Sequence, residues 1–321
     1  MSPAPASVVI ACHSEERFEQ LLAAIESARR QAPAPDHVII AVDNNPALCE
    51  RLRAEVPGIE IVDHRGARGA SAARNAGAAL ARNPYLVFLD DDVRAHPDWL
   101  RELLAPFADA RVIGTGGMTL PSWQGARPRW FPDEFGWVVG ASHAGLPTEP
   151  APVRNVWAEN MAVRRSAFEA VGGFRDGFGK VGATSRPEDT DLCIRIGVNS
   201  PGSRWMYAPS AVVDHFVPRA RSTFAFVLRR CSWEGAGKVE MSAHLADHRD
   251  LDDERSYLMR TLPLALMRYV CTGKLHRAFA ILAGVAFAAA GGAASLRGAR
   301  WRFAMGAAGL GRPTRLGRSH N

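Results

Sequence analysis

Cysteine is scarce in this 321-residue chain, and its five cysteines are scattered without any Cys-x-x-Cys pair. An odd number of widely spaced cysteines argues against a disulfide framework and against a structural zinc site. The first seven residues, MSPAPAS, lack the charged start and the apolar core of a signal peptide. We therefore expect a cytoplasmic protein with reduced thiols.

Acidic residues are missing from the last fifth of the chain. Between Arg255 and Asn321 there are eleven Lys and Arg and no Asp or Glu, which leaves 28 basic and 33 acidic side chains in residues 1–254. The overall charge of +6 therefore belongs wholly to the tail. Because this basic tail surrounds an apolar stretch, it favours an anionic membrane surface over nucleic acid as a partner.

Charge of either sign is missing from the nineteen residues 278–296 of this tail. Their length is enough to span a bilayer, but they are mostly Ala and Gly and include Gly291 and Gly292, so insertion is marginal. Three structures fit them: a transmembrane helix, a helical hairpin at the membrane interface, or a buried helix. A single span would put the basic end outside the cell, so we favour peripheral association.

Strand-like and helix-like segments alternate in the first third of the chain. Apolar strand patterns occur at 7–11, 37–42, 59–62 and 85–89, and helical patterns occur between them at 16–31, 48–55 and 71–81. This alternation predicts an α/β fold with a mostly parallel sheet. Further along, we expect an irregular aromatic stretch at 118–148, strands at 155–163 and 211–217, and a helix that begins near Glu188.

Three consecutive aspartates, Asp90, Asp91 and Asp92, follow the fourth predicted strand. Three adjacent carboxylates repel one another unless a cation lies among them, and Mg²⁺ or Mn²⁺ takes such oxygen ligands. Ligands of open α/β sheets bind at the carboxyl ends of the strands. The pattern predicts an Asp-x-Asp site for a metal and a diphosphate, although a solvated acidic loop fits it as well.

Asp43 follows the second predicted strand, so its side chain and that of Asp90 are expected to face one crevice. The Asp-Asn-Asn-Pro sequence is equally good turn chemistry. Arg74 lies on a predicted helix of small residues, which permits close approach to a ligand, but a solvated arginine is the simpler interpretation.

Glu188 and Asp189 begin a predicted helix, where carboxylates interact favourably with the helix dipole. The alternative to this capping role is general-base catalysis, because a carboxylate beside a second acid can have a raised pKa. His215 ends an apolar strand and is either a core residue or a metal ligand.

Taken in order, these segments resemble the family 2 glycosyltransferases, whose GT-A fold is a Rossmann-like, mostly parallel sheet flanked by helices. The resemblance covers about residues 7–220, and residues 230–235 and 254–255 resemble a subgroup that acts on lipid-linked or polysaccharide acceptors. The matching segments are 7–11, 41–44, 69–77, 88–92, 159–165, 172–174, Glu188-Asp189 and His215.

The resemblance implies a role for each residue of the donor site. Asp43 would bind the base of a nucleotide-sugar, most simply the uracil of a UDP-sugar, and the backbone of Ala11 would line the same pocket. Arg74 and Asp91 would lie near the nucleotide, and Asp90 would contact the ribose or the sugar.

The metal and the catalytic base are implied in the same way. Asp92, with Asp90 and His215, would hold Mg²⁺ or Mn²⁺ on the diphosphate. Asp189 would deprotonate the acceptor hydroxyl, with Glu188 as the alternative base. One base suits a single displacement, so we expect inversion at the anomeric carbon of a hexose-type donor.

The expected organisation is a GT-A domain at 1–225, with a nucleotide-binding half at 1–117 and an acceptor half at 118–225. A helical, basic extension at 226–321 follows, which places the enzyme at the cytosolic membrane face. Two alternatives are a retaining transferase on the same fold and a non-catalytic nucleotide-sugar binder. A nucleotidyltransferase is disfavoured because residues 11–17 offer no glycine-rich phosphate loop with a lysine.

Overall fold

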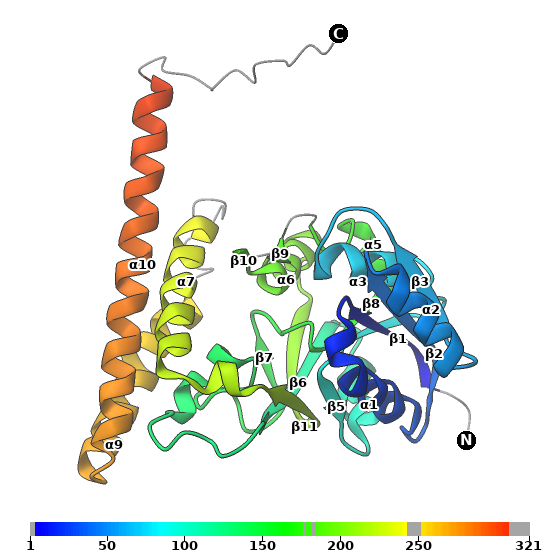
Figure 1. The fold of residues 1–321 in the computed structure, drawn as a ribbon, viewed down its shortest axis with the longest axis horizontal. Helices are drawn as coiled ribbons and strands as arrows, with labels where there is room; N and C mark the ends of the chain where they lie inside the picture. The colour runs from blue at the N-terminus through cyan, green and yellow to red at the C-terminus, as the bar shows by residue number, and fades with distance from the viewer. Residues whose placement is uncertain (1–3, 176–177, 182–183, 243–251, 308–321) are drawn as a thin grey trace.

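The computed structural model describes residues 4–175, 178–181, 184–242 and 252–307, and within them nine strands form one sheet (Figure 1). The strands of this sheet are β1 (Ala4–Cys12), β2 (Pro35–Asp43), β3 (Glu60–His64), β4 (Tyr85–Asp90), β5 (Val93–Ala95), β6 (Val112–Trp123), β7 (Ala151–Val153), β8 (Asn160–Arg164) and β11 (Arg204–Val217). The hairpin of β9 (Gly179–Val181) and β10 (Thr184–Arg186) is separate. The helices are α1 (Phe18–Arg29), α2 (Pro46–Glu55), α3 (Ala70–Ala78), α4 (Trp99–Leu104), α5 (Arg165–Ala170), α6 (Glu188–Asn199), α7 (Phe224–Ser242), α8 (Asp252–Ser256), α9 (Leu262–Cys271) and α10 (Leu275–Ala307).

The amino-terminal half is the predicted parallel sheet, in the order β3-β2-β1-β4. Its strands are apolar on both faces because helices cover both. Val8 and Ile10 pack with Leu21 of α1 in one core, whereas Val9 points into a second core that includes Leu192 of α6. The predicted α/β class and the strands of this half are confirmed.

The second half of the sheet differs from the sequence prediction in two places. Residues 118–123, predicted to be irregular, are the end of β6, because they pair in parallel register with residues 212–217 of β11. The strand predicted at 155–163 begins only at Asn160, after a turn in which the Asn160 N–H donates to the Trp157 carbonyl. β8 is antiparallel to both β4 and β6 and so joins the two halves.

Within the aromatic stretch, Phe131 and Phe135 are buried in a third core, together with Tyr269 of α9 and Ile281 of α10. Trp137 donates a hydrogen bond from Nε1 to the Tyr257 hydroxyl. These aromatic side chains therefore attach the carboxyl-terminal helices to the sheet domain.

The carboxyl-terminal segment α10 is one continuous helix that lies beside α7 (Figure 1). This continuity excludes the hairpin predicted as one alternative for residues 278–296. Gly291 does not bend the helix but permits close packing, since a Cβ there would lie 2.0 Å from the Ser232 carbonyl oxygen of α7. The basic residues after 307, Arg312 among them, lie outside the described residues.

The contacts that hold β8 beside β6 and β11 depend on Asn160, whose side chain is buried. Its Oδ1 accepts a 2.7 Å hydrogen bond from Trp99 Nε1, and its Nδ2 donates to the Met118 and Ala211 carbonyls at 3.2 and 3.0 Å. One amide thus satisfies three polar groups from three segments of the chain, close to the carboxyl end of β4.

Replacing this amide with a side chain of similar size is expected to destabilise the fold. In Asn160→Leu the Trp99 N–H and two buried carbonyls lose their partner, so the free energy of unfolding should fall by about 2–4 kcal/mol. Urea denaturation would measure the loss. Asn199→Leu, at an exposed position on α6, is the matched control, and equal stability of the two variants would contradict the prediction.

Candidate functional site

A buried arginine joins the carboxyl end of β4 to the start of α6. Arg74 Nη2 donates to Asp90 Oδ1 at 2.6 Å, and its Nη1 lies 3.4 Å from Glu188 Oε1. Burial opposes the charged guanidinium, but Asp90, Asp189 and Glu188 outweigh it and raise the pKa of Arg74. The structure thus brings three predicted site residues, all acids, around a fourth, the permanently charged Arg74.

The other two aspartates face different cations. Arg17, which ends the short helix Glu15–Arg17 after β1, donates from Nη1 to Asp91 Oδ1 at 2.8 Å and to Asp92 Oδ2 at 3.0 Å. The His215 Nε2 lies 3.3 Å from Asp92 Oδ1. Burial favours neutral carboxyls here, and it raises the pKa of Asp91 to about 7, but His215 and Arg17 lower the pKa of Asp92.

Glu159 is a further acid of this site that the sequence pattern did not indicate. In the antiparallel register, Asn160 pairs with Leu89, which puts the preceding Glu159 beside Asp90. Burial, together with the charges of Asp90 and Asp92, raises the pKa of Glu159 to about 7 although His215 opposes this shift. The only signal in the sequence was its place beside Asn160 in one of the matched segments.

Arg17 was missed for a similar reason. It falls at the start of the helix predicted at 16–31, where a basic residue is ordinarily a solvated one. Its side chain is 30% exposed and reaches carboxylates more than 70 positions away in the chain. A contact of this kind follows from the parallel order of β1 and β4, not from a local motif.

These carboxylates suit a divalent ion in kind but are not gathered as a preformed cage. In the part of the chain that the structure describes, no three His, Cys, Asp or Glu side chains form such a group. Asp92 and His215 are adjacent, whereas Asp90 is held by Arg74. Carboxylate oxygens and an imidazole are ligands that Mg²⁺ and especially Mn²⁺ accept, and the surplus of acids favours an added cation.

Asp189, in the first turn of α6, is the acid whose hydrogen bonding is incomplete. Its Oδ1 is buried and has no hydrogen-bond partner within the described ranges. Burial and then the charge of Glu188 raise the pKa of Asp189 well above its ordinary value, although Arg74 opposes the shift. A buried carboxylate oxygen without a partner is rare in folded proteins and points to a role in ligand binding or proton transfer.

Asp43 and Ala11 lie at the same edge of the sheet as Asp90. Ala11 of β1 pairs in register with both Ala41 and Asp90. Asp43 ends β2, where its Oδ2 accepts a 2.9 Å hydrogen bond from the Gly69 N–H and its Oδ1 accepts one from Asn44. Asp43 and Asp90 therefore lie at one edge of the sheet, and Asp43 also holds the loop that precedes α3.

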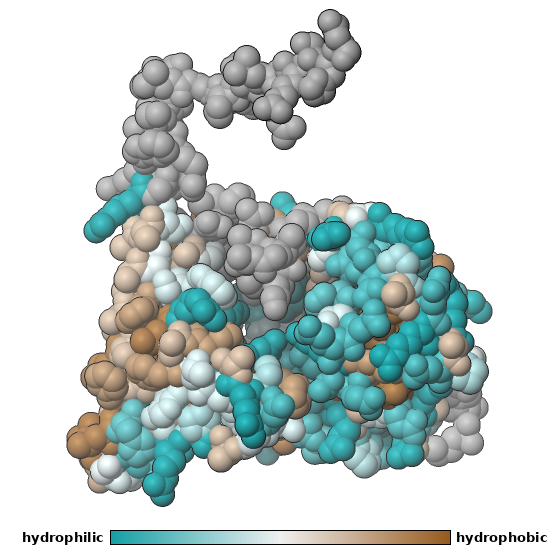
Figure 2. Space-filling view, viewed as in Figure 1, coloured by the Kyte–Doolittle hydropathy of each residue, from teal (hydrophilic) through white to brown (hydrophobic). Residues whose placement is uncertain are grey.

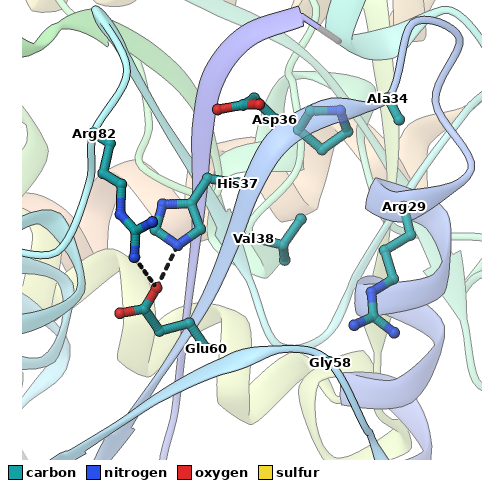
Figure 3. Close-up of a pocket in the computed structure, with 9 residues that line it drawn as sticks. Arg29, Ala34, Asp36, His37, Val38, Gly58, Glu60 and Arg82 are labelled. Carbon is teal, nitrogen blue, oxygen red and sulfur yellow. Dashed lines mark hydrogen bonds and ion pairs between the residues drawn. The ribbon is translucent and has the colours of Figure 1, made fainter.

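A pocket of about 340 Å³ lies away from these acids, beside the amino ends of β2 and β3 (Figure 3). His37 Nε2 and Arg82 Nη2 both reach Glu60 Oε2 there, at 2.6 and 3.2 Å. None of the predicted site residues lines this pocket, and its Arg29 donates to the Pro57 carbonyl. The carboxylate cluster at the opposite ends of the strands remains the candidate active site.

Residues 7–172 match the sequence model of the family described as glycosyl transferase family 2. The chain is 31% identical over 257 residues to a glucosyl-dolichyl phosphate glucuronosyltransferase of Haloferax volcanii, covering 78% of this chain and 81% of that protein. It is 28% identical over 232 residues to a pre-mycofactocin glycosyltransferase of Mycobacterium tuberculosis, of which it spans 48%.

Two solved structures are similar in fold at low sequence identity. The mannosyltransferase PcManGT of Pyrobaculum calidifontis, solved with GDP-Man and Mn²⁺, gives a TM-score of 0.54 at 18% identity, covering 98% of this chain and 84% of that chain. GalNAc-T7, solved with UDP, GalNAc and Mn²⁺, gives a TM-score of 0.51 at 19% identity. That match covers 78% of this chain and 54% of the GalNAc-T7 chain.

The ion pairs of Arg17 generate a prediction about metal and stability. Arg17→Gln leaves Asp91 and Asp92 facing each other without their shared cation, so the metal-free variant should lose about 1–3 kcal/mol, reduced by the partial exposure of Arg17. Thermal unfolding with and without MnCl₂ would measure this. Mn²⁺ should stabilise the variant more than the wild type, because the added ion replaces the missing charge.

The matched control is Arg30→Gln, which removes an exposed arginine paired with Glu26 on α1. It should change neither the melting temperature nor the response to Mn²⁺. An Arg17→Gln variant that melts like the wild type and responds equally to Mn²⁺ would contradict the prediction.

Proposed function

The chain belongs to glycosyl transferase family 2 and is a glycosyltransferase with a GT-A fold, and on that premise we propose the reaction that it catalyses. A hexose-type sugar passes from a nucleotide-sugar, in the first instance a UDP-sugar, to the hydroxyl of an acceptor, with inversion at the anomeric carbon. The observation that carries this proposal is the buried Oδ1 of Asp189, in the cluster around Arg74, which has no hydrogen-bond partner among the described residues.

The donor is proposed to bind along the carboxyl ends of β1, β2 and β4. Asp43 and the Ala11 backbone are placed to contact the base, and Asp90 and Asp91 to contact the ribose, the sugar or the phosphates. Arg74 contributes positive charge beside Asp90. The two structural neighbours, which were solved with UDP and with GDP-Man, support a nucleotide site in this fold.

Asp92 and His215, with Asp90, are the residues proposed to hold Mg²⁺ or Mn²⁺. When bound, the ion would supply positive charge to the diphosphate of the leaving nucleotide. Asp92 is suited to this role because His215 and Arg17 keep its pKa low, so that it stays ionised. Both structural neighbours were solved with Mn²⁺.

Asp189 is proposed as the catalytic base, and Glu188 is the acid next to it in the sequence. Glu188 is already close to Arg74, whereas the Oδ1 of Asp189 has no such partner in the described part of the chain. The acceptor hydroxyl transfers its proton to Asp189 as its oxygen bonds to the anomeric carbon. The bond from that carbon to the diphosphate breaks, and the nucleoside diphosphate leaves.

A lipid-linked hydroxyl is the proposed acceptor, at the cytosolic face of a membrane. The Haloferax relative is named for a glucosyl-dolichyl phosphate acceptor, and the match covers four-fifths of that protein. We assign donor binding and proton transfer to residues 1–225 and membrane contact to the helical residues 226–321.

Removing the proposed base should abolish turnover without affecting donor binding. For Asp189→Asn we expect kcat to fall by about 10²–10⁴, since the amide cannot accept the proton. Release of UDP from UDP-glucose and UDP-glucuronic acid, with a short-chain polyprenyl phosphate glucoside as acceptor, would measure turnover. Asp191→Asn, two residues further along α6, is the control and should stay within a fewfold of wild type. Asp191 pairs with Arg195 at 2.7 Å.

The same reaction should depend on pH in a defined direction. Because burial and Glu188 raise the pKa of Asp189, its basic form is lost at a higher pH than for an ordinary aspartate. The wild-type rate should therefore rise with pH as Asp189 deprotonates. A variant that keeps wild-type turnover without Asp189 would refute its role, and retention of the anomeric configuration in the product would refute inversion.

Donor binding is tested separately by calorimetric titration with UDP, with and without Mn²⁺, on the wild type and on Asp92→Ala. Binding that needs Mn²⁺ and is lost in Asp92→Ala is the expected result. Asp98→Ala, an exposed aspartate after β5, is the control. If UDP, GDP and dTDP all fail to bind under any metal condition, the proposed donor site is wrong.

A further inference from the structure

The outer side of α9 and α10 carries large apolar side chains that stay more than half exposed among the described residues. Leu264, Met267 and Val270 of α9 are 57–61% exposed, and Leu275, Phe279 and Leu282 of α10 are 58–63% exposed. We call these six residues the α9–α10 apolar face. In Figure 2 it forms a hydrophobic area at the lower left, over the corner where the two helices meet. An exposed apolar area of this kind marks a contact surface.

The opposite side of α10 is fixed to the rest of the protein. A Cβ on Gly284 would lie 2.5 Å from the ring of Phe135, and one on Gly235 of α7 would lie 1.9 Å from the Ala288 carbonyl oxygen. Ile281 is fully buried in the same seam. The backbone of α10 therefore packs closely against α7 and cannot leave it without opening the third core.

This packing argues against a transmembrane α10, although its Leu275–Arg297 segment is long and apolar enough to cross a membrane. Helix α7 would have to enter the bilayer with it. Arg230, Glu234 and Lys238 of α7 form ion pairs and keep 26–32% of their side chains exposed. Moving these charges into hydrocarbon is costly. Among the described side chains of α7, Trp233 is the large apolar one that is exposed, at 42%, which is little to offset that cost.

The charges around the α9–α10 apolar face indicate which kind of surface binds there. Arg260, Lys274 and His276 are exposed beside it, and the chain has no acidic residue after Glu254. The nearest acids are Asp133 and Glu134, which already pair with Arg277 and Arg268. A second copy of the chain would bring two basic rims together, whereas an anionic lipid surface complements the rim.

We propose that the α9–α10 apolar face inserts into one leaflet of an anionic membrane and that α10 does not cross it. The apolar side chains enter the acyl boundary, and the basic rim contacts the headgroups. The biological meaning of this membrane contact rests on the proposed function. The binding to the membrane itself requires no glycosyl transfer.

The test is flotation of the full-length protein with vesicles of phosphatidylcholine alone or with 30% phosphatidylglycerol. We expect the partition coefficient on the anionic vesicles to be at least tenfold higher and to fall with salt. The double variant Phe279→Ser/Leu282→Ser should lose at least tenfold on anionic vesicles. Val198→Ser is the matched control, because Val198 is 77% exposed on α6, outside this face.

A second variant tests the charge. Arg260→Gln/Lys274→Gln should weaken binding to the anionic vesicles and leave the weak binding to phosphatidylcholine unchanged. The apolar variant must also keep the wild-type melting temperature and UDP titration, which shows that lost flotation is not lost folding. Failure of the UDP titration in the wild type would reject the donor proposal and leave the membrane result standing.

Three results would overturn the proposal. One is flotation of the Phe279→Ser/Leu282→Ser variant at the wild-type level. Another is wild-type protein that stays with the vesicles through a carbonate wash, which would show a span. The third is a dimer that these substitutions dissociate, in a protein that does not float, which would show that a second copy covers the face.

Discussion

The contact of Arg74 with Asp90 and Glu188 is the interaction on which the active site depends. A buried guanidinium keeps its charge, so the fold must supply it with carboxylates. One comes from the end of β4 and the other from the start of α6, two segments about one hundred residues apart in the chain. By meeting this requirement, the fold brings the next residue, Asp189, beside the sheet edge that we propose as the donor site.

The acids of the cleft outnumber its cations, and this imbalance shapes their chemistry. Arg17 is shared between Asp91 and Asp92, and Arg74 is shared among Asp90 and the acids of α6. In the described part of the chain Glu159 forms no ion pair with an arginine, and burial together with the charges of Asp90 and Asp92 raises its pKa to about 7. A cation brought in with a diphosphate would complete this balance, which is why the donor and metal are proposed to bind together.

The sequence patterns predicted the helices and strands better than the contacts between them. Buried parallel strands are recognisable because both of their faces are apolar, and the acids that follow them stand at one edge by topology alone. Glu159 and Arg17 were missed because their partners are set by the register of β8 on β4 and by the order of β1 and β4. The end of β6 was predicted as irregular because its pairing with β11 leaves no local pattern.

The glycines of α10 have a different effect in the structure from the one that the sequence alone suggests. Gly291 and Gly292 suggest a weak helix when only the sequence is considered, yet Gly291 lets α10 pack closely on α7, so that this side of the helix is not available to lipid. What remains exposed is a one-sided apolar face with a basic rim, while the surplus of acids belongs to the sheet domain. An anionic membrane attracts the basic rim and repels the acidic sheet domain, so the charge distribution alone orients the protein before any apolar side chain inserts.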